Sequence, residues 1–350
     1  MLENFKKGIN VGGWLAQYDV NENGEFAYEQ RMKHFKSFIT IQDIEQIAKW
    51  GADHIRLSIN GELLLEEKCE ENFYYIDECI QWCEDFGINI ILDVHHIEGH
   101  EYGQMQKVIP LLSEEKLQQR LIEVWKRIAN RYATKKKPEI MYELINEISD
   151  ASQGYLWNRL YKDIIKEIRN IDKNHYILVG SNDQNSVFEL KSLDLVSDDK
   201  IVYNFHFYEP QIFTHQKAHF SEDMMKYNHT VHYPDTIDNF ADFLCENPNY
   251  LDKYRWFALE KNINKELLER VLVGAKTFCQ YSGYNLYCGE FGVINNADLK
   301  DINAYVKDVV ELFKEYGIGY AYWNYKEMDF GIVDKNNRVL NQDLISMLFG

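Results

Sequence analysis

Short apolar runs alternate with amphipathic segments along almost the whole chain. The apolar runs predict strands buried on both faces, which is typical of a parallel sheet. Between them, apolar residues recur every three or four positions, which predicts helices with one buried face. The predicted strands cover residues 8–13, 54–59, 88–94, 140–145, 176–180, 201–207, 285–288 and 318–323.

Capping residues support several of the helices. Thr40 is a suitable N-cap, and Gly51 follows the last apolar position of the same helix. Gly87 and Gly317 end two later helices in the same way. The predicted helices begin at about residue 40 and then cover residues 75–86, 117–132, 156–171, 267–278, 302–313 and 341–348.

Eight strands that alternate with helices in one pass predict a (β/α)8 TIM barrel, and we expect residues 1–350 to form a single catalytic domain. The alternative is a doubly wound open sheet, which usually carries a glycine-rich phosphate loop after its first strand. Here Gly12 and Gly13 are followed by Trp14, and the GxGxxG pattern is absent.

One connection is too long for a simple loop. Residues 209–262 separate the sixth strand from its helix, and they contain three of the five prolines and four of the eleven histidines. We expect a partly helical inserted subdomain above the barrel mouth, over the cleft. His215 and His219 are four residues apart, but without an HExxH frame this spacing does not predict a metal site.

Composition narrows the possible partners. The 350 residues are 45% hydrophobic and 27% charged, with a formal net charge of −18. Such a negative field repels phosphate backbones and anionic membranes, so we expect neither nucleic acid nor a membrane as a partner. The N-terminal residues have no apolar h-region, so we expect a protein that stays in the cell unless a leader has been removed.

The cysteines and aromatic residues add little by themselves. The six cysteines form no CxxC pair, which favours free or buried thiols over a metal site. Aromatic residues make up 14% of the chain, which fits either a large core or a cleft lined with rings that stack on sugars.

Two glutamates stand at the ends of apolar strands and carry the clearest chemical signal. Glu147 closes the run Ile145-Asn146-Glu147, and Glu290 lies in Tyr287-Cys288-Gly289-Glu290. A closed barrel would bring them together at the carboxyl ends of its strands. Paired carboxylates suit cleavage of a glycosidic bond, because one protonates the leaving oxygen while the other attacks the sugar carbon or activates water.

Other polar and aromatic residues fall at equivalent strand ends. Arg56 and Tyr208 could keep a nucleophilic carboxylate ionised. His95 and His96 are adjacent, so only one of them can face the cleft, and they do not form the HxH metal motif. We expect the other residues at these strand ends to bind sugar hydroxyls, orient a glutamate or provide a stacking floor. Together with Arg56 and Tyr208, the candidate substrate-binding and supporting residues are Trp14, Arg56, His95, His96, Asn146, His206, Tyr208 and Trp323.

These motifs resemble glycoside hydrolase family 5, the cellulase family, and within it bacterial endoglucanases of the endoglucanase C type. The resemblance implies a retaining endo-acting β-glycanase on a (β/α)8 barrel that needs no cofactor. It assigns Glu147 as acid/base and Glu290 as nucleophile. The remaining strand-end residues would complete the site, and the insertion would cover part of the cleft. The motifs are 8–14 (GINVGGW), 54–57 (HIRL), 92–96 (LDVHH), 143–147 (ELINE), 202–208 (VYNFHFY), 213–219 (FTHQKAH), 287–293 (YCGEFGV) and 323–326 (WNYK).

Three functional hypotheses follow. The first is an endo-β-1,4-glucanase acting as a monomer on a β-glucan polysaccharide or oligosaccharide, with mixed-linkage β-glucan as a further candidate substrate. The second keeps the fold and mechanism but acts on β-mannan or glucomannan. The third is a non-catalytic sugar-binding barrel, which would be expected to lack one glutamate. For a retaining enzyme we expect the two carboxyl groups to lie about 5 to 5.5 Å apart.

Overall fold

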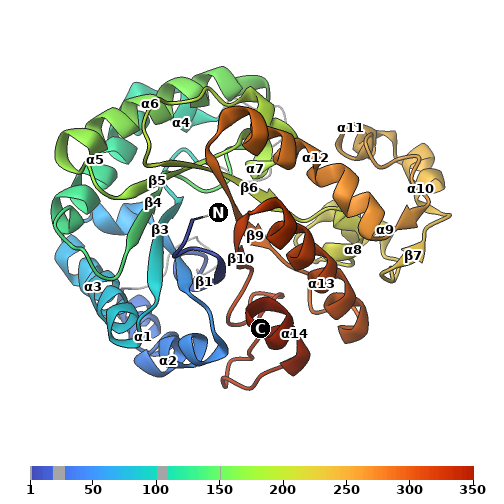
Figure 1. Cartoon of the computed structure of the whole chain (residues 1–350), viewed down its shortest axis with the longest axis horizontal. Helices are drawn as coiled ribbons and strands as arrows, with labels where there is room; N and C mark the ends of the chain where they lie inside the picture. The colour runs from blue at the N-terminus through green and yellow to red at the C-terminus, as the bar shows by residue number, and fades with distance from the viewer. Residues whose placement is uncertain (1, 19–27, 101–108, 150) are drawn as a thin grey trace.

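A computed structural model of the chain describes residues 2–18, 28–100, 109–149 and 151–350. Eight parallel strands form a closed barrel, in the spatial order β1-β10-β9-β6-β5-β4-β3-β2. Figure 1 shows this ring with the helices outside it. The predicted (β/α)8 architecture is therefore confirmed. The barrel strands are β1 (Lys7–Leu15), β2 (His54–Asn60), β3 (Asn89–His96), β4 (Ile140–Glu143), β5 (Tyr176–Gly180), β6 (Ile201–Phe207), β9 (Asn285–Phe291) and β10 (Gly319–Tyr322).

The helices of the outer layer match the predicted periodicity, and their ends follow the predicted caps. Thr40 and Asp43 form a capping box at the start of α2, and Gly51 ends it with a positive φ of 95°. The helix α1, the short helix α4 and the segment α7, whose backbone is largely left-handed, were not predicted. The helices of this layer and its loops are α1 (Tyr28–Ser37), α2 (Ile41–Trp50), α3 (Cys69–Phe86), α4 (Pro110–Ser113), α5 (Glu115–Tyr132), α6 (Gly154–Ile171), α7 (Asn182–Asn185), α12 (Lys265–Ser282), α13 (Leu299–Tyr316) and α14 (Gln342–Phe349).

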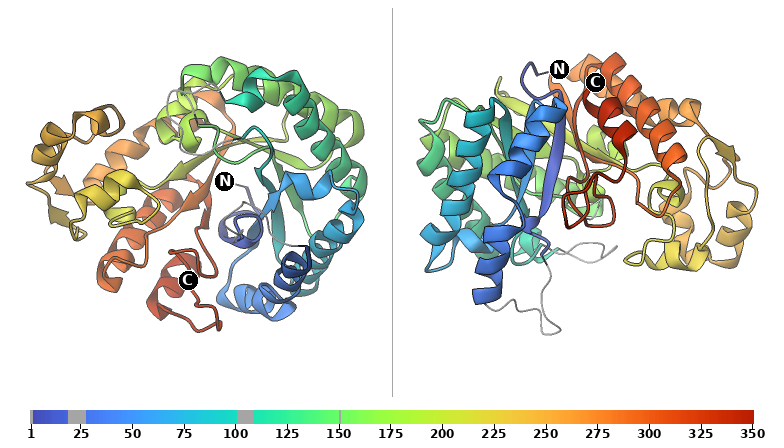
Figure 2. Two further views of the ribbon diagram at one scale, coloured as in Figure 1. Left: turned by 180° about the vertical axis from the view of Figure 1, so that it is seen from behind. Right: turned by 90° about the horizontal axis from the view of Figure 1, so that it is seen from below.

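The connection between β6 and β9 contains short helices, as expected, and also a small antiparallel sheet that the pattern did not predict. In Figures 1 and 2 these elements lie on one side of the barrel, beyond α12 and α13. No helix in the described part of the chain combines the length and apolar character needed to cross a membrane. The elements of the insertion are α8 (Gln211–Thr214), α9 (Glu222–Tyr227), β7 (Asp235–Thr236), α10 (Phe240–Glu246), α11 (Leu251–Tyr254) and β8 (Asn262–Ile263).

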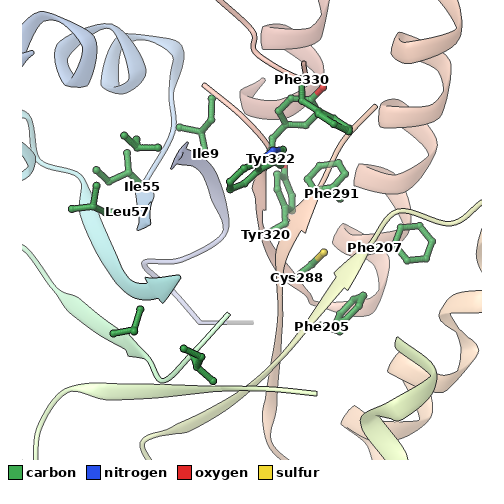
Figure 3. Packing of buried hydrophobic residues seen from close by; sticks show 14 of the residues in the cluster. Ile9, Ile55, Leu57, Phe205, Phe207, Cys288, Phe291, Tyr320, Tyr322 and Phe330 are labelled. Carbon is green, nitrogen blue, oxygen red and sulfur yellow. The ribbon is translucent and has the colours of Figure 1, made fainter. Parts of the chain in front are cut away.

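Apolar packing stabilises the wall of the barrel on its outer side. Aromatic rings from β6, β9 and β10 face α13, where Phe291 and Phe207 both pack edge-on against Phe313. Figure 3 shows Phe205, Phe207 and Phe291 along these strands. Burial of such large rings is among the main contributions to the stability of the fold.

The interior of the barrel is apolar at one end and polar in the middle. A separate small cluster fills the amino-terminal end, where Phe5 from the start of the chain packs on inward-facing strand residues. In Figure 1, the start of the chain accordingly lies in line with the centre of the ring of strands. One layer further along, the inward-facing side chains are fully buried and polar, namely Asn10, Arg56, Asp93, Glu143 and Asn204. This polar layer supports the carboxyl ends of the strands, where function is expected.

Candidate active site

Glu147 and Glu290 meet in one site at the carboxyl end of the barrel. Glu147 follows β4, while Glu290 lies within β9, which extends further than predicted. One carboxylate oxygen of each glutamate and one ring nitrogen of His206 all lie within 4.8 Å of one another. His206 Nδ1 is 2.7 Å from Glu147 Oε1 and 3.7 Å from Glu290 Oε2. The two carboxylates therefore face the same small space, as two groups that act on one glycosidic bond must.

Two hydrogen-bond donors stabilise the ionised form of Glu290. Arg56 Nη1 donates to Oε1 at 2.8 Å, and the Tyr208 hydroxyl donates to Oε2 at 3.0 Å. Hydrogen bonds of this kind fix the position of both carboxylate oxygens. Glu290 is therefore prepared to act as a nucleophile.

Glu147 lies in a different environment. Burial raises its pKa to about 8, although the charge of Arg56 acts in the other direction. A carboxyl group with this pKa carries its proton at neutral pH and can give it to a leaving group. Burial also lowers the pKa of His206 to about 4, so the imidazole beside Glu147 is neutral. The backbone of Glu147 has a φ of 29°, an uncommon value for a residue with a side chain.

Arg56 connects the site to the polar layer below it. It lies inside β2 rather than at the strand end where it was expected, and it is fully buried. Its guanidinium donates twice to Glu143, at 2.6 and 2.9 Å, and lies 3.1 Å from Asp93. It also donates to the side-chain oxygens of Asn10 and Asn146, both at 2.9 Å. Although burial opposes its charge, the carboxylates hold the pKa of Arg56 well above its ordinary value.

The rings of His95 and Trp323 stack on each other at the carboxyl end of the barrel. Their rings stack with centroids 5.6 Å apart and planes 9° from parallel, and His95 Nδ1 lies 2.6 Å from Asp93 Oδ2. Gly12 leaves room for the indole, because a Cβ there would lie 2.6 Å from Trp323 Cη2. The register between β2 and β3 shifts between Ile59 and Asn60, and Asn60 pairs with His96. The regular alternation of side chains is therefore broken near His96. His96 is half-buried, and its contact with substrate remains a prediction.

Comparison with known proteins agrees with this geometry. Residues 19–329 match the family described as cellulase (glycosyl hydrolase family 5). The chain is 40% identical over 355 aligned positions to Endoglucanase C of Acetivibrio thermocellus, covering 99% of this chain and 98% of that protein. The chain belongs to glycosyl hydrolase family 5.

More distant relatives also resemble the chain over most of its length. Cellodextrinase A of Ruminococcus flavefaciens is 29% identical, with 89% of this chain and 83% of that protein covered. Among solved structures, Cel5A of Thermotoga maritima in complex with mannotriose has a TM-score of 0.75 at 22% identity, covering 99% of this chain and 97% of that one. At that identity the structural match supports the (β/α)8 fold alone.

The buried polar layer of this family 5 chain was not predicted from the strand pattern. Asp93 lies two residues before His95 and Glu143 four before Glu147, so strand alternation would have placed each on the same face as its predicted partner. Burial raises the pKa of Asp93 to about 7, against the lowering effect of Arg56. The missed residues that contact Arg56 or one another are Asn10, Asp93, Glu143 and Asn204.

Trp14 does not belong to the cleft of this family 5 barrel, which corrects the prediction made for it. Its side chain is fully buried, its Nε1 donates to the carbonyl of Phe35, and its ring stacks on Trp82. Gly13 has a φ of 75° and interrupts the alternation of β1, which turns Trp14 toward the outer helices. Trp14 is therefore a packing residue.

Two clusters in the described residues bring three potential metal ligands close together. The first is the site itself, Glu147, His206 and Glu290, where Arg56 and Tyr208 already donate to one carboxylate. The second is the surface group His232, Asp298 and Asp301. His215 is close to Tyr208 instead, and His219 is largely exposed, so their spacing reflects packing of the insertion.

Proposed function

We propose that the protein is a retaining endo-β-1,4-glucanase. The observation that carries this proposal is the meeting of two glutamates in different surroundings, with one carboxylate oxygen of each within 4.8 Å of the other: Glu290 accepts hydrogen bonds from Arg56 and Tyr208, and Glu147 has a pKa raised by burial. The likeness to proteins named endoglucanase over nearly the whole chain supports β-1,4-glucan as the substrate.

The mechanism follows from the two environments. Glu290 attacks the anomeric carbon while Glu147 transfers its proton to the glycosidic oxygen, so the bond to the leaving sugar breaks and a glycosyl ester forms on Glu290. Glu147, now ionised, takes a proton from water. The resulting hydroxyl attacks the same carbon and releases Glu290. Two displacements at one carbon retain its configuration.

Other residues support these two steps. Asn146 lies beside the acid, with its side-chain oxygen held by Arg56, so its amide nitrogen is available to a sugar hydroxyl. The Trp323 ring would form the floor under the reacting sugar. Segment 209–262 would border the cleft, because Thr214 and His215 contact Tyr208, which donates to the nucleophile.

Turnover of carboxymethyl cellulose and barley β-glucan tests the proposal. We expect activity in the wild type, and its loss in Glu147→Gln and Glu290→Gln. The exposed Glu315 near the end of α13 provides a matched control, Glu315→Gln, which should behave as the wild type. Proton NMR of the first product should show the β anomer. Undiminished activity in either site variant, or a first-formed α anomer, would contradict the proposal.

Mannan remains the alternative substrate, since glucose and mannose differ at one hydroxyl and the same residues would serve both. Rates on glucomannan and β-mannan beside those on β-glucan decide between the two. Tight oligosaccharide binding without release of reducing sugar would instead support a non-catalytic binding protein.

A further inference from the structure

We propose that Asn185 is a positioning residue that fixes the proton of His206 on Nδ1, and thereby keeps the catalytic proton of Glu147 on the oxygen that His206 does not contact. This inference rests on the proposed role of Glu147 as acid/base. It concerns a residue of the β5–β6 connection that carries no recognisable sequence signal.

The contacts of the His206 ring define its tautomer. Asn185 Nδ2 lies 3.1 Å from His206 Nε2, and an amide nitrogen can only donate. His206 Nε2 must therefore accept, and it carries no proton. Because burial lowers the pKa of His206 to about 4, the ring is neutral and has one N–H group. That group is Nδ1–H, which points at Glu147 Oε1 over 2.7 Å.

This tautomer determines where the acid can hold its proton. Glu147 Oε1 faces an N–H donor, so the proton of the neutral acid belongs on Oε2. When Oε2 gives that proton to the glycosidic oxygen, Glu147 becomes a carboxylate, and the bond from His206 to Oε1 becomes charge-assisted. With the opposite tautomer, a bare Nδ1 would accept the acid proton and would then repel the carboxylate.

The backbone around Asn185 is built to hold it in place. Asp183, Gln184 and Asn185 form a left-handed turn with φ values of 53°, 58° and 55°. Such values are costly for residues with side chains, and a consecutive run of them persists only where surrounding contacts impose it. The backbone N–H of Gln184 donates to the backbone carbonyl of Ile148 at 2.7 Å, and Ile148 directly follows Glu147 in the sequence.

The end of the same turn is tied to β6. Ser186 forms a parallel bridge with His206, so the backbone of this segment contacts His206 itself and Ile148, the residue after Glu147. Two glycines make space for the contact. A Cβ on Gly180 would lie 2.4 Å from Asn185 Oδ1, and one on Gly289 would lie 3.0 Å from His206 Nε2.

Variants at this position can separate tautomer control from packing. Asn185→Asp keeps the shape of the side chain but cannot donate to Nε2, so it favours a proton on that nitrogen. Asn185→Gly accepts the positive φ and removes the amide altogether. Gln184→Asn, on the neighbouring position of the same turn, is the matched control because asparagine also tolerates this backbone conformation.

The decisive measurement is the ¹⁵N NMR spectrum of the His206 ring, assigned by its loss in His206→Gln. In the wild type at neutral pH we expect a protonated Nδ1 and an unprotonated Nε2. In Asn185→Asp the proton should move to Nε2 or occupy both nitrogens. On barley β-glucan, kcat should fall by at least about tenfold in both Asn185 variants. KM should stay within about twofold of the wild-type value, because the loss lies in the proton transfer.

The outcomes separate this inference from the proposed function. A wild-type ring protonated on Nε2 would overturn the inference, whatever the fate of the variants. So would an unchanged tautomer in Asn185→Asp, even if turnover fell, because Asn185 would then act only through packing. If the wild type shows the expected tautomer but turns over no β-glucan, the inference about His206 stands and the proposed function fails.

Discussion

Glu147 and Glu290 are the same residue type at the same end of one barrel, but their surroundings have opposite effects. Glu290 receives hydrogen bonds from a guanidinium and a phenol, which stabilise its charge. Glu147 is 2.7 Å from a neutral imidazole, and burial raises its pKa to about 8. The proposed roles of nucleophile and acid thus depend on which glutamate is hydrogen-bonded to Arg56.

The largest difference should appear between substrates with poor and good leaving groups. Glu290→Gln removes the attacking group, so activity should fall by about 10⁵-fold or more on carboxymethyl cellulose and on dinitrophenyl β-cellobioside alike. Glu147→Gln should lose about 10²- to 10⁴-fold on the polysaccharide. It should still release dinitrophenol in a rapid first turnover, because that group leaves without a proton. Equal losses for both variants on the activated substrate would contradict the assigned roles.

Replacement of Arg56 should damage both stability and the charged state of Glu290. Lysine cannot reproduce the fork that binds Glu143 and Asp93, and it leaves buried carboxylates without partners. We expect Arg56→Lys to lower the free energy of unfolding by about 3 to 5 kcal/mol, measured by urea denaturation. A loss below about 1 kcal/mol would mean that the polar layer tolerates a point charge.

The ionisation of Glu147 should lower the free energy of unfolding at basic pH, and Glu147→Gln should remove this loss. Its folded pKa of about 8 lies above the ordinary value of 4.5, so the folded state binds the proton more tightly than the unfolded state. Stability is therefore full below about pH 4.5 and falls as the pH rises through 8. Glu147→Gln should be more stable than the wild type by about 5 kcal/mol at pH 9, with no difference at pH 4. A gap independent of pH would contradict this reasoning.

The same pKa predicts the basic limb of activity. Glu147 must be protonated to act as an acid, so kcat/KM should fall as the pH rises above about 8, by about tenfold per unit. A limb that remained unchanged in Asn185→Gly would be compatible with this assignment, since Glu147 itself is retained. A wild-type profile that stays flat to pH 10 would contradict it.

The smallest effects should distinguish the two tryptophans. Trp323→Ala removes the ring that we propose as the floor under the reacting sugar, so kcat/KM should fall by about tenfold. Trp14→Phe alters only core packing, so we expect a loss of about 1 to 2 kcal/mol in stability with unchanged kinetic constants. A changed KM in Trp14→Phe would indicate that Trp14 affects substrate binding and is not only a packing residue.

Most of the barrel and both glutamates could be predicted because they depend on local pattern. Strand runs and capping glycines such as Gly51 leave a direct trace in the sequence. Trp14 was misjudged because one positive φ at Gly13 reverses the alternation that a strand prediction assumes. Asn185 was missed for a related reason, since left-handed turns of ordinary residues depend on tertiary contacts rather than on composition.

Arg56 contacts side chains from strands at both ends of the chain, including Asn10 of β1 and Glu290 of β9. The guanidinium can acquire all these partners only when the ring of strands has closed. The return of hydrolytic activity during refolding therefore indicates that the barrel has closed. A chain that has collapsed without pairing its first and last strands would have no activity.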